Sequence, residues 1–394
     1  MSAASPHAPI RVGVIGGSVR SAVGYAHMAA LRMDGRYAVA AGAFSRDPET
    51  NDATGAAAGL CPDAIHRDWR SMLARDAARL DAAIVLTPTP THAEIVAECL
   101  EADLPVLCEK ALASTSAEAL LLRDQVASSA GFLAVTYNYS GYPIVRELRS
   151  RIASGDLGRI VQIQAEMPQE GFIRRTAEGA PAAQPQAWRL SDGPAPTLHL
   201  DLAVHLHQLV FYLTGLRPRE ATAMQDSFGC FEGVVDSVSA LARYDNGAAA
   251  SFWFTKAALG HRNGLRLRLY GERGSAEWFQ AEPETLLLNH ADGRREIVDR
   301  GGSADVAAQP RYARFKAGHP AGYVEAFANL YVDIADALDD YRKTGRWSSN
   351  EVCGVETALE GLLFAETLAA AARNRDWLRV PRPPPFRQIA RKAS

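Results

Sequence analysis

The chain has 394 residues, 47% hydrophobic and 22% charged, which are the proportions of a globular protein long enough for two domains. With 42 basic and 45 acidic residues the net charge is −3, so charge gives no reason to expect a nucleic acid or an anionic membrane as partner. No apolar run approaches the roughly 18 residues of a membrane-spanning helix. The five cysteines include no C-x-x-C pair. We therefore expect a cytoplasmic protein without a disulfide framework or a zinc knuckle.

The first half of the chain alternates short apolar runs with helical patterns. Residues 1–9 contain no apolar signal core and are expected to form a disordered, extended leader. The expected strands are residues 10–16, 37–44, 82–86, 105–108 and 132–136. The expected helices are residues 24–33, 68–75, 91–102 and 116–129, the last capped by Ser114 or Ser116. This alternation predicts a Rossmann-type α/β domain over residues 10–136, with a parallel sheet and helices on both faces.

The second half has a different rhythm and predicts an α+β domain over residues 137–380. The expected helices are residues 143–154, 197–214, 322–343 and 351–373. The expected strands are residues 160–167, 221–227, 237–244, 248–255, 265–270, 276–278, 285–289 and 295–298. Because most strands follow one another across turns, we expect an open, mainly antiparallel sheet with helices on one face. Residues 168–196 read as a long loop, and the Pro- and Arg-rich tail, 381–394, as an extended segment.

A glycine turn separates the first expected strand from the first helix. Gly16 and Gly17 let the chain turn sharply and bring backbone N–H groups against a pyrophosphate at the positive end of the helix dipole. The pattern departs from G-x-G-x-x-G, because Ser18 and Arg20 stand where glycine is more usual, and a tight turn without a ligand is the alternative. We expect Gly16, Gly17 and Ser18 to bind a nicotinamide dinucleotide.

The end of the second expected strand bears on the choice between NAD and NADP. An acid at this position would bind the ribose 2′-hydroxyl of NAD, but the chain has Ser45 and Arg46 and no acid until Asp47. Ser45 and Arg46 are suited to contact a 2′-phosphate, which favours NADP, unless Arg46 is simply solvated. The expected cofactor is therefore NAD(P), with a lean toward NADP.

Two polar motifs follow the third and fourth expected strands. The first is Thr87-Pro88-Thr89-Pro90-Thr91-His92, and the second is Cys108-Glu109-Lys110-Ala111. Ligands of open α/β sheets bind at the carboxyl ends of parallel strands. We therefore expect a group of side chains from these motifs to line the dinucleotide site, namely Thr87, Pro88, His92, Glu109 and Lys110.

In their order and spacing these motifs resemble the glucose–fructose oxidoreductase / inositol dehydrogenase / MocA (Gfo/Idh/MocA) family. The resemblance covers nearly the whole chain and includes a D-x-x-x-H motif at Asp201 and His205. It implies that Lys110, the lysine of the family's EKP motif, bonds the reacting oxygen. It also implies that His205 is the acid–base for the substrate hydroxyl, which suits a side chain of ordinary pKa near 6.5, and that Asp201 orients it or bonds a neighbouring hydroxyl.

Two departures from the family pattern bear on specificity: Ala111 replaces the proline of EKP, and Thr89 replaces an asparagine. Each catalytic candidate also has a plainer interpretation, since Lys110 can be a surface lysine and His205 a core histidine. His199 and His207 are not at ligand spacing with His205, so no metal is expected.

The expected substrate contacts are Trp188 and Arg189 at the end of the long loop, and Tyr137, Asn138 and Tyr142 after the fifth strand. Each of them is equally suited to packing between domains.

The resemblance implies an NAD(P)-dependent oxidoreductase that transfers a hydride to or from a secondary hydroxyl or keto carbon of a sugar, cyclitol or modified sugar. The alternatives are a non-catalytic dinucleotide-binding sensor of the same fold, and a reductase of an imine or diketone. The family analogy further implies that the open sheet pairs with another subunit, in a homodimer or homotetramer.

Overall fold

In the computed structural model, which describes residues 8–302 and 304–385, the chain forms two compact units. The first unit comprises residues 8–141, 323–359 and 383–385, and the second comprises residues 142–322 and 360–382. Most of the leader and most of the tail lie outside the described residues.

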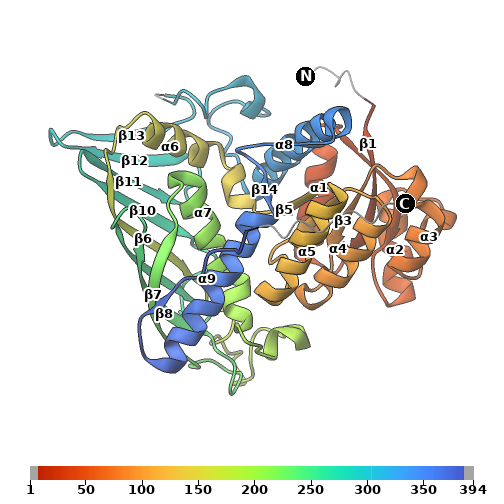
Figure 1. Ribbon diagram of the computed structural model, residues 1–394, viewed down its shortest axis with the longest axis horizontal. Coiled ribbons are helices and arrows are strands. Elements are labelled where there is room, and N and C mark those ends of the chain that lie inside the picture. Colours follow the sequence, from red (N-terminus) through yellow and green to blue (C-terminus); the bar gives the residue numbers. More distant parts are fainter. Residues whose placement is uncertain (1–7, 303, 386–394) are drawn as a thin grey trace. The chain divides into compact units, whose positions relative to one another are not determined.

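The first unit contains a six-stranded sheet in the order β14-β5-β4-β3-β1-β2 (Figure 1). Its strands are β1 (Ile10–Gly16), β2 (Tyr37–Ala43), β3 (Ala82–Leu86), β4 (Val106–Glu109), β5 (Leu133–Thr136) and β14 (Cys353–Gly354). The first five are parallel to one another, and β14 is antiparallel to β5. The parallel Rossmann sheet predicted from the alternating pattern is confirmed.

Helices cover both faces of this sheet. They are α1 (Ala22–Met33), α2 (Pro48–Ala58), α3 (Trp69–Asp76), α4 (His92–Glu101), α5 (Ser116–Ser129) and α8 (Tyr323–Thr344). On one face α1 and α8 share a hydrophobic core with alternate residues of β1 and β3, among them Val12, Val14 and Ile84. On the other face α4 packs against β3, β4 and α5.

Two local features of the first unit differ from expectation. The cap of α5 is Thr115, which forms a capping box with Glu118, instead of Ser114 or Ser116. Helix α2 was not expected, because its buried face consists of Thr50, Asn51, Thr54 and Gly55 and lacks an apolar stripe. Its end signals were present in the sequence, since Asp47 caps it, Pro48 opens it and Gly59 closes it in the left-handed conformation.

The expected domain boundary is corrected by helix α8. The sequence suggested that this helix completes the second domain, whereas residues 323–359 belong to the first unit. The reason lies in its apolar face, where Phe327, Leu330, Ile334 and Leu338 are buried in the core shared with α1. The chain passes from the first unit to the second within α9 (Val355–Asn374).

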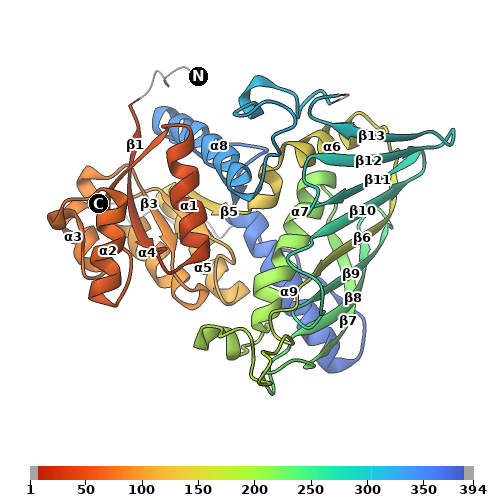
Figure 2. The ribbon, with the colours of Figure 1, turned by 180° about the vertical axis from the view of Figure 1, so that it is seen from behind.

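The second unit contains a nine-stranded sheet in the order β13-β12-β11-β10-β6-β9-β8-β7-β15. Its strands are β6 (Ile160–Pro168), β7 (Pro218–Asp226), β8 (Ser237–Tyr244), β9 (Ala249–Thr255), β10 (Arg266–Gly271), β11 (Gly274–Phe279), β12 (Thr285–His290), β13 (Arg295–Asp299) and β15 (Leu378–Arg379). Only the β6–β9 pair is parallel, so the predicted, mainly antiparallel sheet is confirmed. Helices α6 (Pro143–Ala153) and α7 (Val204–Thr214) and the later part of α9 lie on one face of it (Figures 1 and 2).

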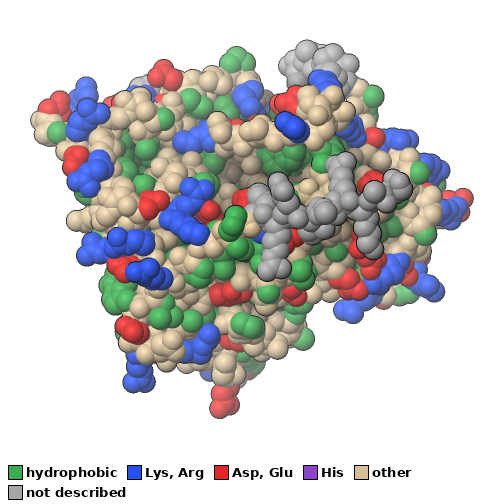
Figure 3. All heavy atoms as spheres, in the orientation of Figure 1, with side chains coloured by type: hydrophobic (Ala, Val, Ile, Leu, Met, Phe, Trp, Pro, Cys, Tyr) green, Lys and Arg blue, Asp and Glu red, His purple; other side chains and the backbone are tan. Residues whose placement is uncertain are grey.

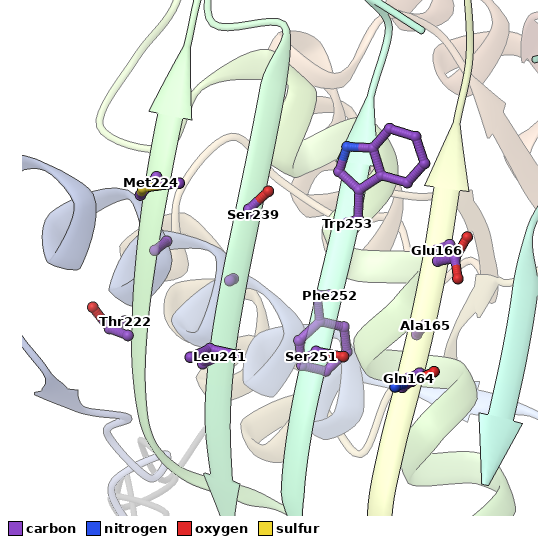
Figure 4. Close-up of a pocket in the computed structure, with 12 residues that line it drawn as sticks. Gln164, Ala165, Glu166, Thr222, Met224, Ser239, Leu241, Ser251, Phe252 and Trp253 are labelled. Atoms are coloured by element: carbon purple, nitrogen blue, oxygen red, sulfur yellow. The ribbon is translucent and has the colours of Figure 1, made fainter.

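The opposite face of this sheet carries no helix among the described residues. Side chains alternate across the strands, so that Ala240 and Phe252 are buried toward the helices while Met224 and Leu241 are 68% and 49% exposed. Figure 4 shows the central part of this surface. We call it the outer sheet face, and it comprises Gln164, Glu166, Thr222, Met224, Ser239, Leu241, Ser251 and Trp253.

Among the residues that the structure describes, no helix is both long and apolar enough to span a bilayer. Basic and acidic side chains are interspersed over the face drawn in Figure 3, without a broad field of one sign.

Candidate active site

The glycine turn after β1 admits no side chain. Gly16 and Gly17 have φ of 81° and 69°, a region that favours glycine. A Cβ at Gly16 would lie 2.8 Å from backbone atoms of Leu86 and Thr87, and a Cβ at Gly24 would lie 2.5 Å from the Cα of Gly17. The turn therefore presses against β3 and α1 and leaves backbone N–H groups at the start of a twelve-residue helix. This cradle fits a dinucleotide pyrophosphate.

The loop after β2 presents Ser45 and Arg46, and Arg46 is exposed. Asn51 fixes the start of this loop, because its Oδ1 accepts hydrogen bonds from the backbone N–H groups of Phe44 at 2.8 Å and Ser45 at 3.2 Å. The first acid of the loop, Asp47, caps α2 and accepts from the Thr50 backbone N–H at 3.0 Å. One oxygen of the Asp47 carboxylate is thus engaged within the protein.

His92 joins the ends of β3 and β4. Its Nε2 lies 2.7 Å from the carbonyl oxygen of Thr87, and its Nδ1 lies 2.8 Å from that of Ala111. Burial lowers the pKa of His92, against the effect of both carbonyl groups and of Glu109. The expected cofactor-site residues Thr87, His92 and Lys110 are therefore gathered at one edge of the sheet. Pro88 lies within the same segment, and the Lys110–Ala111 peptide bond is cis.

In the second unit a carboxylate is held between two cations. Asp201 Oδ2 lies 2.6 Å from Lys256 Nζ and 3.0 Å from Arg189 Nη1. The guanidinium of Arg189 also stacks on the ring of Trp188 at 4.4 Å. The predicted substrate contacts Trp188, Arg189 and Asp201 therefore come together, although they span a loop and a helix.

The expected helix over residues 197–214 begins differently from prediction. Residues His199–Ala203 form a π-helical turn, and the α-helix α7 starts at Val204. Asp201 lies in the π-helical turn and His205 in the α-helix. Single π-helical turns inserted next to α-helices are frequent at functional sites.

Lys256, which pairs with Asp201, was not among the residues expected from the sequence. It follows β9 directly, is 8% exposed, and its Nζ lies 4.9 Å from the centre of the Phe172 ring. Its signal was a lysine at the end of an apolar strand. Without knowledge of which helix faces that strand end, nothing in the sequence pairs it with Asp201.

The two other histidines of this region are unsuited to acid–base work. Burial lowers the pKa of both His199 and His207 to about 3, so each is neutral at physiological pH. Both ring nitrogens of His199 are buried without a hydrogen-bond partner among the described residues. Across residues 8–302 and 304–385, no group of three or more His, Cys, Asp or Glu side chains is arranged to hold a metal ion.

The candidates that follow β5 are buried. Tyr137 and Asn138, in the first unit, are 1% and 3% exposed. The Asn138 Nδ2 has no hydrogen-bond partner among the described residues, so a buried donor is left over at this strand end. Tyr142, in the second unit, packs against Trp278 with ring centres 5.3 Å apart, which is a core contact.

Comparison with known proteins accounts for both units. A family model described as an oxidoreductase family with an NAD-binding Rossmann fold matches residues 10–137, and a Gfo/Idh/MocA C-terminal domain model matches residues 145–277. The chain belongs to the Gfo/Idh/MocA oxidoreductase family. As a family member it is an oxidoreductase with an NAD-binding Rossmann domain.

Several members of the Gfo/Idh/MocA family resemble the chain over most of its length. An uncharacterized oxidoreductase of Bacillus subtilis, YfiI, is 29% identical over 92% of this chain and 95% of its own. Levoglucosan dehydrogenase of Pseudarthrobacter phenanthrenivorans is 25% identical over 80% of this chain and 83% of its own. The crystal structure of an inositol dehydrogenase homolog from Azotobacter vinelandii, complexed with NADH and myo-inositol, is 28% identical. It aligns with a TM-score of 0.85 over 94% of this chain and 97% of its own.

A double-mutant cycle tests the Lys256–Asp201 pair. The side chains of Lys256 and Asp201 are only 9% and 18% exposed. We expect Lys256→Met and Asp201→Asn to show a coupling energy of roughly 1–3 kcal/mol in urea unfolding. As a control, the exposed Arg159–Glu272 pair of the same unit should show a coupling near zero. Equal coupling in the two cycles would contradict a partly buried, tightly held Asp201.

Proposed function

We propose that this protein is an NAD(P)-dependent dehydrogenase that transfers a hydride between the nicotinamide and a secondary hydroxyl or keto carbon of a sugar, cyclitol or modified sugar. The observation that carries the proposal is the Arg189–Asp201–Lys256 cluster, whose carboxylate belongs to the residue four positions before His205. A carboxylate flanked by cationic donors, beside an aromatic ring, suits a ligand with several adjacent hydroxyl groups. Two relatives named for such ligands, an inositol dehydrogenase homolog and a levoglucosan dehydrogenase, support the substrate class.

The side chains of Lys110, His205 and Asp201 act on different parts of the reaction. Lys110 donates a hydrogen bond to the reacting oxygen and stabilises negative charge that develops there. His205 exchanges the hydroxyl proton. Asp201, which lies within 3.0 Å of both of its cationic partners, accepts a hydrogen bond from a neighbouring substrate hydroxyl or orients His205. The nicotinamide, when bound, supplies hydride-transfer chemistry, and its pyrophosphate is held by the Gly16–Gly17 turn.

Replacement of Lys110 or His205 by alanine tests these roles. We expect each variant to lose about 100-fold or more in kcat against a panel of polyols, because a group acting on the reacting oxygen is removed. The affinity for NADH, measured by fluorescence, should change little in His205→Ala. Matched controls are Lys343→Ala on α8 and His290→Ala on β12, which should keep wild-type turnover.

Full activity in both Lys110→Ala and His205→Ala would refute the mechanism. A wild-type protein that binds NADH but turns over no polyol would instead favour the sensor. Turnover restricted to imines or diketones would favour the reductase.

We further propose that Ser45 and Arg46 allow the site to accept the 2′-phosphate of NADP. The support is the engagement of Asp47 in the α2 cap and the exposure of Arg46. Arg46→Ala should lower the ratio of kcat/KM for NADP to that for NAD by about tenfold, the size of one charge-assisted hydrogen bond. Arg32→Ala, which removes an exposed arginine of α1, is the control. An unchanged ratio in Arg46→Ala would remove this arginine from cofactor recognition.

We propose, lastly, that a second copy of the chain covers the outer sheet face in a homodimer or homotetramer. The support is the apolar exposure of Met224 and Leu241 on a sheet face without helices. In sedimentation equilibrium the wild type should have at least twice the mass of one chain, and Leu241→Glu should shift it toward one chain. Leu121→Glu, at a leucine 71% exposed on α5, should keep the wild-type mass. A monomeric wild type would contradict the proposal.

A further inference from the structure

A buried row of polar side chains runs through the first unit and ends beside Lys110. His27 of α1 is fully buried, and its two ring nitrogens contact two different elements. Nδ1 lies 2.6 Å from the hydroxyl oxygen of Tyr331 on α8, and Nε2 lies 3.0 Å from Oε1 of Glu109 at the end of β4. The Glu109 carboxylate also accepts from Thr136 Oγ1 at 2.7 Å and from the Lys110 backbone N–H at 3.1 Å.

The donors and acceptors of this row are mutually consistent. An ionised Glu109 only accepts hydrogen bonds, so Nε2 of His27 must donate to it. In the neutral ring Nδ1 then accepts from the Tyr331 hydroxyl, and in the protonated ring Nδ1 donates to it. Because a hydroxyl can do either, the row keeps all its hydrogen bonds in both states of His27. His92 differs, since both of its partners are carbonyl oxygens and a neutral ring donates to only one of them.

The row keeps Glu109 charged in a buried position. Burial alone raises the pKa of Glu109, but the hydrogen bond from His27, the charges of His27 and Lys110, and the bond from Thr136 outweigh it, and the net pKa is lowered. An ionised carboxylate, 7% exposed, therefore stands immediately before the lysine.

A purely structural role accounts poorly for this arrangement. The core around His27 is otherwise apolar, and the His27 ring packs at 4.4 Å from that of Phe327. Apolar residues of similar volume often stabilise such a core as well as, or better than, a buried charged pair. The Glu109 carboxylate accepts a hydrogen bond from the backbone N–H of Lys110, which points to a role in positioning that residue.

We propose that His27 and Glu109 are positioning residues, which hold the strand end that carries Lys110 through the Tyr331–His27–Glu109 row. The inference rests on the proposed function only for its effect on turnover. The backbone of Lys110 is then held in place, which fixes the position of its ammonium group. Loss of the row allows the ammonium to move away from the reacting oxygen. A displacement of about 1 Å is enough to cost about 100-fold in rate.

The first unit provides a matched control. His66 and Asp76 form a second buried histidine–carboxylate pair, with Nε2 and Oδ2 2.6 Å apart. Within the described part of the chain this pair extends to Arg79 and does not reach residues 108–111. His66→Leu therefore removes a comparable buried pair from the same unit. Any loss that it shares with His27→Leu measures general destabilisation.

The experiment compares His27→Leu, His27→Gln, Tyr331→Phe and His66→Leu with the wild type. We expect His27→Leu to lower kcat about 10- to 100-fold with the KM for the dinucleotide within about threefold. His27→Gln, whose amide can still donate to Glu109, should recover part of the loss. Tyr331→Phe, which removes one oxygen atom and is the variant least prone to misfold, should show a smaller loss. His66→Leu should lower the unfolding temperature and leave kcat unchanged.

A second measurement is independent of turnover. The rate at which Lys110 is labelled by an amine-reactive reagent, followed by peptide mass spectrometry, should rise about threefold or more in His27→Leu, because its segment is loosened. It should stay at the wild-type rate in His66→Leu.

Equal kcat and equal labelling in His27→Leu and the wild type, or equal losses in His27→Leu and His66→Leu, would overturn the inference. If the wild type turns over no substrate, the proposed function fails, and the labelling rates alone decide whether the row positions Lys110.

Discussion

The close approach of the Gly16–Gly17 turn to the end of β3 is the constraint on which the rest of the first unit depends. A single Cβ at Gly16 would meet the backbone at Leu86 and Thr87, so the turn, the third strand and the start of α1 occupy one tightly packed corner. Because β1, β3 and β4 are parallel and adjacent, the same corner brings Thr87, His92 and Lys110 to the edge where the turn presents its N–H groups. The cradle and the catalytic candidate are thus consequences of one packing arrangement.

In each unit, a carboxylate with little exposure to solvent is paired with side chains from other elements of the fold. Asp201 lies between a loop arginine and a lysine at the end of β9, and Glu109 lies between a histidine of α1 and a threonine of β5. An unpaired buried charge would be expelled or neutralised, whereas a paired one remains ionised and fixed in direction. Groups held in this way suit a site that must recognise hydroxyl groups and guide a proton.

The architecture could be predicted from local patterns to a large extent. Strands β1, β3 and β8 have the expected bounds, because apolar runs and alternation are local signals of burial. Helix α2 was not predicted, because its buried face of Thr, Asn and Gly carries no apolar stripe. Strands β14 and β15 were not predicted, because two residues are too few to form a recognisable pattern. The place of α8 was misjudged, because an amphipathic stripe says that a helix is buried without saying against what.

The sequence by itself determined the glycine turn, the strand-end motif with Lys110, the spacing of Asp201 and His205, and the family to which they belong. These are local, since each depends on residues within a few positions of one another. Only the tertiary structure decided the partners: Lys256 reaches Asp201 across 55 positions, Glu109 meets His27 across 82, and Tyr331 meets His27 across 304. Such pairs are selected by which buried surfaces pack together, and that choice depends on the whole core, which no short stretch of sequence encodes.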